Sequence, residues 1–167
     1  MDDELAQFCR REHPRLVGAL DLVCGSLGLA EDLAQETLAR ICRDWAKVRR
    51  LDAPGAYAHR VAMNLAVSAF RRRAAERRAH DKVGRRASDM VVLTDGADAV
   101  AVRSALAALR PEQRQVLVAR YYLGYDVNGT ADVLRLPVGT VKTHTHRGLA
   151  ALRQLLGEDV TEAMSRA

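Results

Sequence analysis

A single stretch without helical spacing divides this sequence into two segments. The stretch runs from Gly84 to Asp98 and holds two glycines, three aspartates and several small polar residues. On both sides of it, apolar residues recur every three or four positions, which is the period of an amphipathic helix. Because glycine, aspartate and small polar residues favour linkers, the sequence predicts two small helical domains joined by a tether of about fifteen residues.

The composition agrees with an all-α fold. Aromatic residues make up 4% of the 167 residues, a low share for a β-sandwich or a β-barrel. Alanine, leucine and arginine dominate instead, and these residues favour helices. The chain holds 26 basic and 21 acidic residues, so its formal net charge of +5 makes an anionic partner plausible.

Several classes of protein are not indicated. Cys9, Cys24 and Cys42 are odd in number, widely spaced and free of any CxxC pair, so neither a disulfide framework nor a zinc finger is predicted. The acidic first residues are unlike a secretory signal, and charges interrupt every apolar stretch before the ~20 residues that a membrane span needs. We therefore expect a cytoplasmic protein that does not contact a membrane.

The apolar spacing also predicts where the helices lie. The first segment is expected to form helices at about 3–24, 30–48 and 54–78, with His13-Pro14 breaking or restarting the first. The second segment is expected to form a helix from Val100 to Leu109, one that starts at Pro111, and two more at about 126–134 and 138–156. The expected domains are therefore residues 1–83 and 99–156, with a linker at 84–98 and a tail at 157–167.

The second predicted helix has two distinct faces. Its apolar face, which includes Trp45, is expected to be core. The opposite face carries Asp32, Gln35, Glu36, Ala39 and Arg43, which by themselves fit a solvated surface. The order Ala30-Glu31-Asp32-Leu33-Ala34-Gln35-Glu36-Thr37-Leu38 resembles region 2.2 of the bacterial sigma factors. That resemblance implies that Asp32, Gln35, Glu36 and Arg43 bind the clamp of core RNA polymerase.

The third predicted helix ends in a block of arginines. Residues 60–86 hold nine basic and two acidic groups, and such a block must be solvated or matched by anions. Apolar residues at 57, 61, 65 and 69 or 70 are expected to face the core. A solubilising helix end is one interpretation, and a phosphate backbone that supplies the anions is the other.

The segment from Ala56 to Arg78 is also similar to sigma regions 2.3 and 2.4. This similarity implies binding of the minus-10 promoter element through Asn64, Arg60, Arg71 and Arg72. Asn64 would hold a flipped base in a pocket framed by the loop Val48 to Ala53, since an amide both donates and accepts hydrogen bonds. A buried capping asparagine is the competing interpretation of Asn64.

The last two predicted helices carry the most specific motif. The sequence Pro137-Val138-Gly139-Thr140-Val141-Lys142-Thr143-His144, with Leu109 to Leu117 before it, is similar to sigma region 4, a helix-turn-helix. An inner face is expected at Val141, Thr145, Gly148, Leu152, Leu155 and Leu156. The resemblance implies that Lys142, Thr143, His146 and Arg147 contact the minus-35 element, where basic side chains can donate to guanine. Whether His146 reads a base, binds a phosphate or only covers the helix is open.

The motif departs from the family pattern at four positions. Family members often carry an acidic and a β-branched residue at Gly129 and Thr130, a glycine at Arg135, and a polar cap at Pro137. Gly129 costs about 1 kcal/mol of helix propensity, and loss of a polar N-cap costs typically about 1 kcal/mol more. We expect the first helix of the motif to have low stability. The sequence does not give the effect of these four positions on minus-35 affinity.

Taken together, the chain resembles an extracytoplasmic-function (group IV) sigma factor of the short actinobacterial type. The resemblance implies an alternative sigma factor that directs core polymerase through its clamp and flap, reads the minus-35 element and melts promoter DNA at the minus-10 element. It implies no cofactor and no metal, and it leaves open an anti-sigma partner, the promoter sequence and the inducing signal. No motif indicates an enzyme. The rival hypotheses are a helix-turn-helix transcriptional regulator and a sigma-like protein that binds polymerase without initiating.

Overall fold

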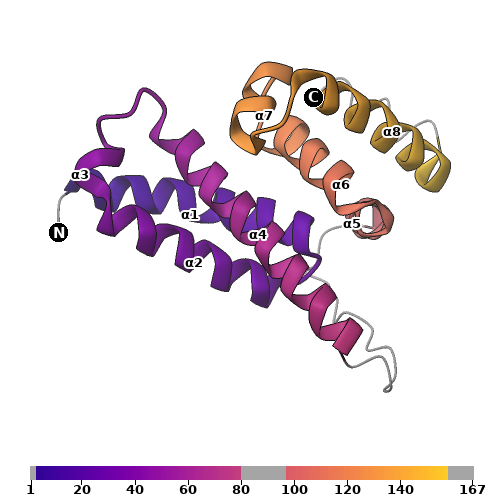
Figure 1. Ribbon diagram of the computed structural model, residues 1–167, viewed down its shortest axis with the longest axis horizontal. Helices are drawn as coiled ribbons and strands as arrows, with labels where there is room; N and C mark the ends of the chain where they lie inside the picture. Colours follow the sequence, from indigo (N-terminus) through magenta and orange to yellow (C-terminus); the bar gives the residue numbers. More distant parts are fainter. Residues whose placement is uncertain (1–2, 80–96, 158–167) are drawn as a thin grey trace. The chain divides into compact units, whose positions relative to one another are not determined.

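The structure is a computed structural model that describes residues 3–79 and 97–157, and every regular element in these ranges is helical (Figure 1). The chain divides into two compact units, Met1–Val91 and Val92–Ala167. The predicted all-α fold with two small domains is confirmed. Of the predicted linker, residues 84–96 lie outside the described ranges, and the second unit's first helix begins at Ala97.

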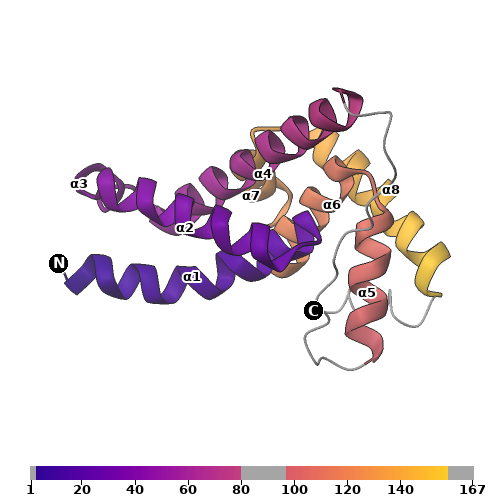
Figure 2. The same cartoon turned by 90° about the horizontal axis from the view of Figure 1, so that it is seen from below.

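The N-terminal unit consists of α1 (Asp3–Cys24), α2 (Leu27–Arg43), α3 (Trp45–Val48) and α4 (Pro54–Ala79). Helices α1 and α2 lie side by side, and α4 packs against both of them (Figures 1 and 2). None of the helices in the described part of the chain is long and apolar enough to span a bilayer.

Helix α1 contradicts the prediction that His13-Pro14 breaks the first helix. It runs without interruption from Asp3 to Cys24 with Pro14 inside it. An internal proline costs a helix about 3 kcal/mol or more. Here Phe8 and Leu16, on either side of Pro14, are both buried in the unit's core, while Pro14 itself is exposed. Burial of these flanking side chains outweighs the cost of the proline.

The second predicted helix is divided into two. Helix α2 begins at Leu27, three residues before the predicted start, because the Ser26 side chain caps it by accepting a hydrogen bond from the Leu29 N–H. It ends at Arg43, since Asp44 leaves helical geometry with φ −102° and ψ 14°. The short α3 then begins at Trp45.

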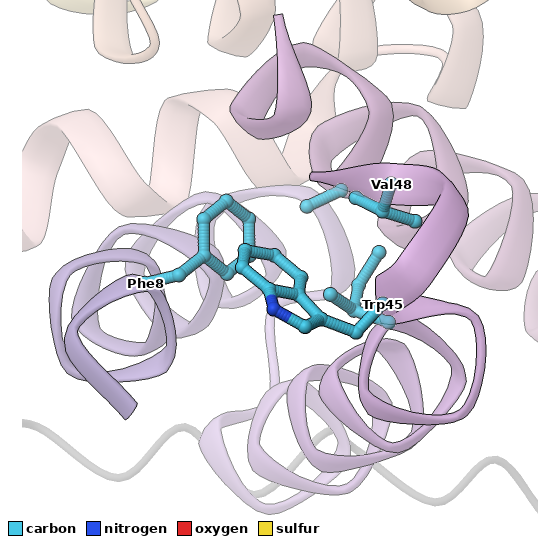
Figure 3. Close-up of a cluster of buried hydrophobic side chains, with 5 residues drawn as sticks. Phe8, Trp45 and Val48 are labelled. Atoms are coloured by element: carbon cyan, nitrogen blue, oxygen red, sulfur yellow. The ribbon is translucent and has the colours of Figure 1, made fainter. Parts of the chain in front are cut away.

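An aromatic pair forms part of the core of this unit (Figure 3). The rings of Phe8 and Trp45 lie with their centroids 5.2 Å apart, and Ile41, Val48 and Ala58 are buried in the same cluster. The assignment of Trp45 to the core is confirmed. Truncating a buried aromatic residue of this kind typically costs about 3–5 kcal/mol, so this cluster holds α1, α2, α3 and the start of α4 together.

The inner face of α4 differs in part from the prediction. Leu65 and Ala69 are buried as expected, but Tyr57 and Val61 are only half-buried. The most deeply buried apolar residues of this helix are Ala58, Ala62, Met63 and Ala66. The small side chains of the alanines let α4 approach α1 and α2 closely. The prediction relied on large apolar residues and therefore placed the buried face of α4 on a different side of the helix.

The C-terminal unit consists of α5 (Ala97–Ala108), α6 (Pro111–Leu117), the π-helical turn η1 (Val118–Tyr122), α7 (Val127–Leu134) and α8 (Val138–Leu156). Helix α6 begins at Pro111 and α8 runs from Val138 to Leu156, as predicted. Val116, Ala131 and Val141 form a buried cluster that joins α6, α7 and α8. Gly148 lets α8 approach α6, because a Cβ there would lie 2.9 Å from Leu117 Cδ1.

The positions that depart from the family pattern are structurally distinct. Arg135 is the only non-glycine residue with positive φ in the described ranges, at φ 53°. Thr130 is fully buried. Pro137 is the N-cap of α8 and no side chain caps that helix, whereas Asp126 caps α7 by accepting a hydrogen bond from the Gly129 N–H at 2.6 Å.

The end of the predicted inner face of α8 needs correction. Val141, Thr145, Gly148 and Leu152 are buried as predicted, but Leu156 is only half-buried and Leu155 is 54% exposed. Both leucines lie in the last turn of α8, just before the C-cap Gly157, and therefore beyond the last buried residue of the helix, Leu152.

Candidate functional site

The first group of candidate residues lies on one exposed face of α2. Asp32, Gln35, Glu36 and Arg43 are all exposed, while Ala30, Ala34 and Ile41 on the opposite side are fully buried. The structure therefore brings the four residues together on one surface, which we call the α2 face. Its orientation is fixed because the other side of the helix is packed against α1 and α4.

The acidic groups of the α2 face differ in their ion pairs. Glu36 Oε1 lies 2.5 Å from a guanidinium nitrogen of Arg40, one helical turn later. Arg43 lies 3.8 Å from the carboxylate of Asp44. Within the described part of the chain, Asp32 has no ion pair. A cationic partner would therefore meet an uncompensated carboxylate at Asp32, whereas at Glu36 it would have to compete with Arg40.

The second group of candidate residues lies on α4. Arg60, Asn64 and Arg71 are spaced by four and seven residues, which places them on one face of the helix. Asn64 and Arg71 are exposed, and Arg60 is half-buried. Because Asn64 is exposed in the middle of a helix, the alternative of a buried capping asparagine is wrong. Arg72 is exposed beside them, 4.0 Å from the carboxylate of Glu76.

A hollow of about 280 Å³ connects the two groups. Helix α2 contributes Glu36 and Arg40 to it, and α4 contributes Asn64 and Arg72. Its other lining residues are Leu33, Leu65, Ser68 and Ala69. The loop 48–53, which was expected to frame a pocket around Asn64, does not line this hollow. The hollow has an apolar floor and polar walls with two arginines, one carboxylate, one amide and one hydroxyl, a mixture suited to a polar planar group that carries negative charge.

The third group of candidate residues lies on α8. Lys142, Thr143, His146 and Arg147 are all exposed. They lie opposite Val141, Gly148 and Leu152, which hold the helix against the rest of the unit. The Thr143 hydroxyl donates to the Gly139 carbonyl oxygen at 2.9 Å, so it would have to rotate to donate to another partner.

Several buried charged or titratable residues were missed by the sequence reasoning, and three of them make contacts between helices. Arg114 donates to the carbonyl oxygens of Ala107 and Leu109 at 2.8 and 3.0 Å, and so closes the end of α5. Glu12 and His59 are buried in the N-terminal unit, with Nε2 of His59 3.2 Å from Oε2 of Glu12. Glu12 occurs four residues after Phe8 and four before Leu16, which places it on the apolar face of α1. This spacing could have predicted that Glu12 is buried.

The environment of His59 changes its protonation. Burial lowers the pKa of His59 below its usual value of 6.5, and the nearby charge of Arg15 lowers it further. The carboxylate of Glu12 acts in the opposite direction, but its effect on the pKa is smaller than that of burial. His59 is therefore neutral at neutral pH. Because it is enclosed in the core, it serves the packing of α1 against α4 rather than an exposed site.

Comparisons with known proteins agree with this arrangement. The family model for sigma-70 region 2 matches residues 8–76, and the model for sigma-70 region 4 matches residues 99–152. The RNA polymerase sigma-E factor of Streptomyces coelicolor is 32% identical over 127 residues, which cover 76% of this chain and 71% of the relative. The ECF RNA polymerase sigma factor SigM of Mycobacterium tuberculosis is 30% identical over 151 residues, which cover 90% of this chain and 76% of the relative.

A solved structure has the same fold. It is that of the sigma factor RpoE in complex with the anti-sigma factor NepR from Bartonella quintana. The TM-score is 0.82 at 22% sequence identity, and the match covers 93% of this chain and 98% of that chain.

Proposed function

This chain belongs to the sigma-70 family of RNA polymerase sigma factors, in its extracytoplasmic-function group, and we propose how its residues direct polymerase to promoters. The observation that carries the proposal is the hollow of the N-terminal unit, which places Glu36 of the α2 face beside Asn64 and Arg72 of α4. A single rigid unit can thereby hold the polymerase on α2 and unpaired promoter DNA on α4. We assign this work to two domains, residues 1–83 and 99–156, with 84–98 between them, although α5 of the second unit already begins at Ala97.

The α2 face binds the clamp of core polymerase. Asp32, which has no ion pair within the described residues, meets a basic group of the clamp, and Gln35 adds a hydrogen bond. Glu36 contributes less, since it must exchange its contact with Arg40 for one with the polymerase. Complementary charge of this kind also raises the rate of association.

Helix α4 binds the melted minus-10 element. Arg60 and Arg71 lie on the same face as Asn64, so phosphates on either side of a base held at Asn64 have basic partners. The hollow next to Asn64 receives the base edge, where an amide offers both a donor and an acceptor. Among the aromatic residues of this unit, Phe8 and Trp45 are buried and Tyr57 and Phe70 are half-buried. Because none of the four is fully exposed, base capture contributes more than stacking does.

Helix α8 enters the major groove of the minus-35 element. Lys142 and Arg147 donate to guanine or to phosphate, and Thr143 donates once it leaves Gly139. The second unit also contacts the polymerase flap, so the promoter is held at two points. This role needs no catalysis, cofactor or metal of the chain's own, and it places the protein in the cytoplasm with the chromosome.

The rival functions differ in what the N-terminal unit does. A helix-turn-helix regulator carries a separate sensor in front of its DNA-binding unit, whereas residues 8–76 match sigma-70 region 2. A sigma-like protein that does not initiate would bind polymerase and leave promoters closed. RpoE of Bartonella quintana forms a complex with the anti-sigma factor NepR, and an inhibitory partner of that kind is proposed for this chain.

Charge reversal on the α2 face tests the proposal. The variant Asp32→Lys/Glu36→Lys should lose binding to core polymerase at least tenfold while its far-UV circular dichroism is unchanged. The matched control is Asp3→Lys/Asp52→Lys, which makes the same change of charge at two exposed positions of the same unit that lie outside α2. Equal binding by the two variants would contradict the assignment of the α2 face.

A further inference from the structure

Two of the three cysteines, far apart in the sequence, lie next to each other in the N-terminal unit. Sγ of Cys9 on α1 is 4.0 Å from Sγ of Cys42 on α2. None of the three cysteines is in a disulfide in the structure, and Cys24 is buried at the C-terminal end of α1, away from Cys9. The sequence argument against a disulfide framework considered spacing along the chain, which does not reveal this contact between two helices.

Residues near the two thiols in the sequence also pack on each other. Phe8, which precedes Cys9, packs on Trp45, which follows Cys42 by three residues, with ring centroids 5.2 Å apart. The two sulfur atoms need to approach by about 2 Å more to reach the ~2.05 Å length of a disulfide bond. The bond would require side-chain rotation and a small shift of one helix. Cys42 is exposed and Cys9 is half-buried, so solvent reaches the pair from the side of Cys42.

We propose that Cys9 and Cys42 form a reversible intramolecular disulfide, with low-molecular-weight disulfides as the oxidant, that braces α1 against α2. In the first step the Cys42 thiolate attacks one sulfur of the oxidant RSSR, whose S–S bond breaks. This step gives a mixed disulfide at Cys42 and one RS⁻, which takes a proton from water. In the second step the Cys9 thiolate attacks Sγ of Cys42 and displaces the second RS⁻. Two protein thiols are oxidised by two electrons, and RSSR is reduced to two RSH.

The two thiols have different parts in this sequence. Burial, reinforced by the neighbouring Cys42, raises the pKa of Cys9 to about 11, so Cys9 is protonated at neutral pH. Exposed Cys42 is therefore the thiol that meets the oxidant, and Cys9 closes the bond. Once Cys42 carries the R group it holds no negative charge to oppose ionisation of Cys9, while the effect of burial remains. Closure should therefore accelerate as pH rises.

The consequence is an oxidation-dependent stabilisation of the N-terminal unit. The bond would link two positions 33 residues apart, and a closed loop of that size restricts the unfolded chain considerably. We expect the melting temperature of this unit to rise by about 10 °C on oxidation. Trp45 is the only tryptophan of the chain, so its fluorescence reports the unfolding of the braced unit.

Incubation of the full-length protein with oxidised glutathione tests the proposal. After alkylation of the remaining thiols, non-reducing peptide mass mapping should find Cys9 linked to Cys42 and Cys24 alkylated. The bond should form faster at about pH 8.5 than at about pH 7 and should disappear with dithiothreitol. The Trp45 melting temperature should rise with the bond and return to its starting value on reduction.

Three variants separate the possible outcomes. Cys24→Ala should behave as the unaltered protein does. Cys9→Ser should stop at a glutathione adduct on Cys42, and Cys42→Ser should form no bond and no adduct at Cys9. A persistent adduct on Cys42 in the unaltered protein, a dimer linked through Cys42, a bond that includes Cys24, or no reaction would each overturn the proposal. A Cys9–Cys42 bond without a rise in the melting temperature would overturn the bracing role.

Discussion

His59 Nε2 lies 3.2 Å from Glu12 Oε2 inside the N-terminal unit, where both side chains are 2% exposed. The other oxygen of Glu12 lies 2.9 Å from Arg11 Nε and close to Gly55 in the first turn of α4, where a Cβ would be 3.2 Å from it. A carboxylate near a helix N-terminus is stabilised by the helix dipole. This buried polar contact therefore ties α1 to the start of α4, the helix that carries Asn64.

The lowered pKa of His59 makes the stability of this unit depend on pH. In the unfolded chain His59 takes up a proton below its usual pKa of 6.5, whereas in the folded chain it stays neutral to a lower pH. The unfolded state then binds more protons, so stability falls as pH decreases below about 6.5. Urea unfolding followed by Trp45 fluorescence should show a lower free energy of unfolding at about pH 5.5 than at about pH 7.

His59→Gln is the matched variant for this effect. It removes the titrating group but keeps a side chain that can donate a hydrogen bond to Glu12. The decrease in stability between the two pH values should be smaller in His59→Gln than in the unaltered protein. The same decrease in both proteins would assign the pH dependence to other groups.

We expect the buried hydroxyl of Thr130 to lower the stability of the C-terminal unit. Its Oγ1 has no hydrogen-bond partner within the described residues and the side chain is fully buried. Thr130→Val keeps the shape and removes the unsatisfied group, and should stabilise this unit by about 1 kcal/mol. Unfolding of this unit in denaturant should be followed by circular dichroism, because Trp45 fluorescence reports the N-terminal unit.

Thr145 provides the comparison for Thr130. It is also buried, but its Oγ1 donates to the Val141 carbonyl oxygen at 2.8 Å. Thr145→Val should therefore change the stability by less than about 0.5 kcal/mol. If the two valine variants were equally stable, the missing partner of Thr130 would have no energetic effect.

Arg135 occupies the left-handed region between α7 and α8, with φ 53° and ψ 46°. Left-handed geometry costs a non-glycine residue about 1–2 kcal/mol. Glycine removes this cost, but it also raises the entropy of the unfolded chain, which offsets part of the stabilisation. Arg135→Gly should stabilise the unit by about 0.5–1 kcal/mol. Arg135→Ala keeps the strained backbone and loses only the side chain, so a similar gain in the alanine variant would exclude the strain as the cause.

The exposed basic residues of α8 should determine the salt dependence of promoter binding. Lys142→Ala/Arg147→Ala should weaken occupancy and lower the slope of log affinity against log salt by about two if both side chains contact phosphates. Arg110→Ala/Arg153→Ala removes the same charge from exposed positions of the same unit and should change the slope little. Equal slopes for the two variants would move the DNA contacts away from the N-terminal half of α8.

The helices and their exposed faces could be predicted from the sequence because amphipathic spacing is a local property. The ends of α4 and α8 and the burial of Ala34, Ile41 and Trp45 opposite the α2 face follow directly from that spacing. Comparison with the family motif also showed that Arg135 stands where members often carry glycine. The structure gives the reason, since Arg135 has the left-handed backbone geometry that glycine adopts most readily.

What could not be predicted depends on contacts between distant residues. Pro14 is tolerated because Phe8 and Leu16 pack on the rest of the unit, and the alanines of α4 face inward because α1 and α2 lie close. The Glu12–His59 contact and the hollow shared by Glu36 and Asn64 each join separate helices. Spacing within one helix carries no information about such pairs.

The most direct test of the account is in vitro transcription from a randomised promoter pool with core polymerase from a matched bacterium. The chain should program RNA synthesis from discrete start sites that share two sequence elements. Asp32→Lys/Glu36→Lys should abolish these transcripts, and Lys142→Ala/Arg147→Ala should reduce those that depend on the upstream element. Synthesis that starts at the same sites with both variants as with the unaltered chain would contradict the division of work between α2 and α8.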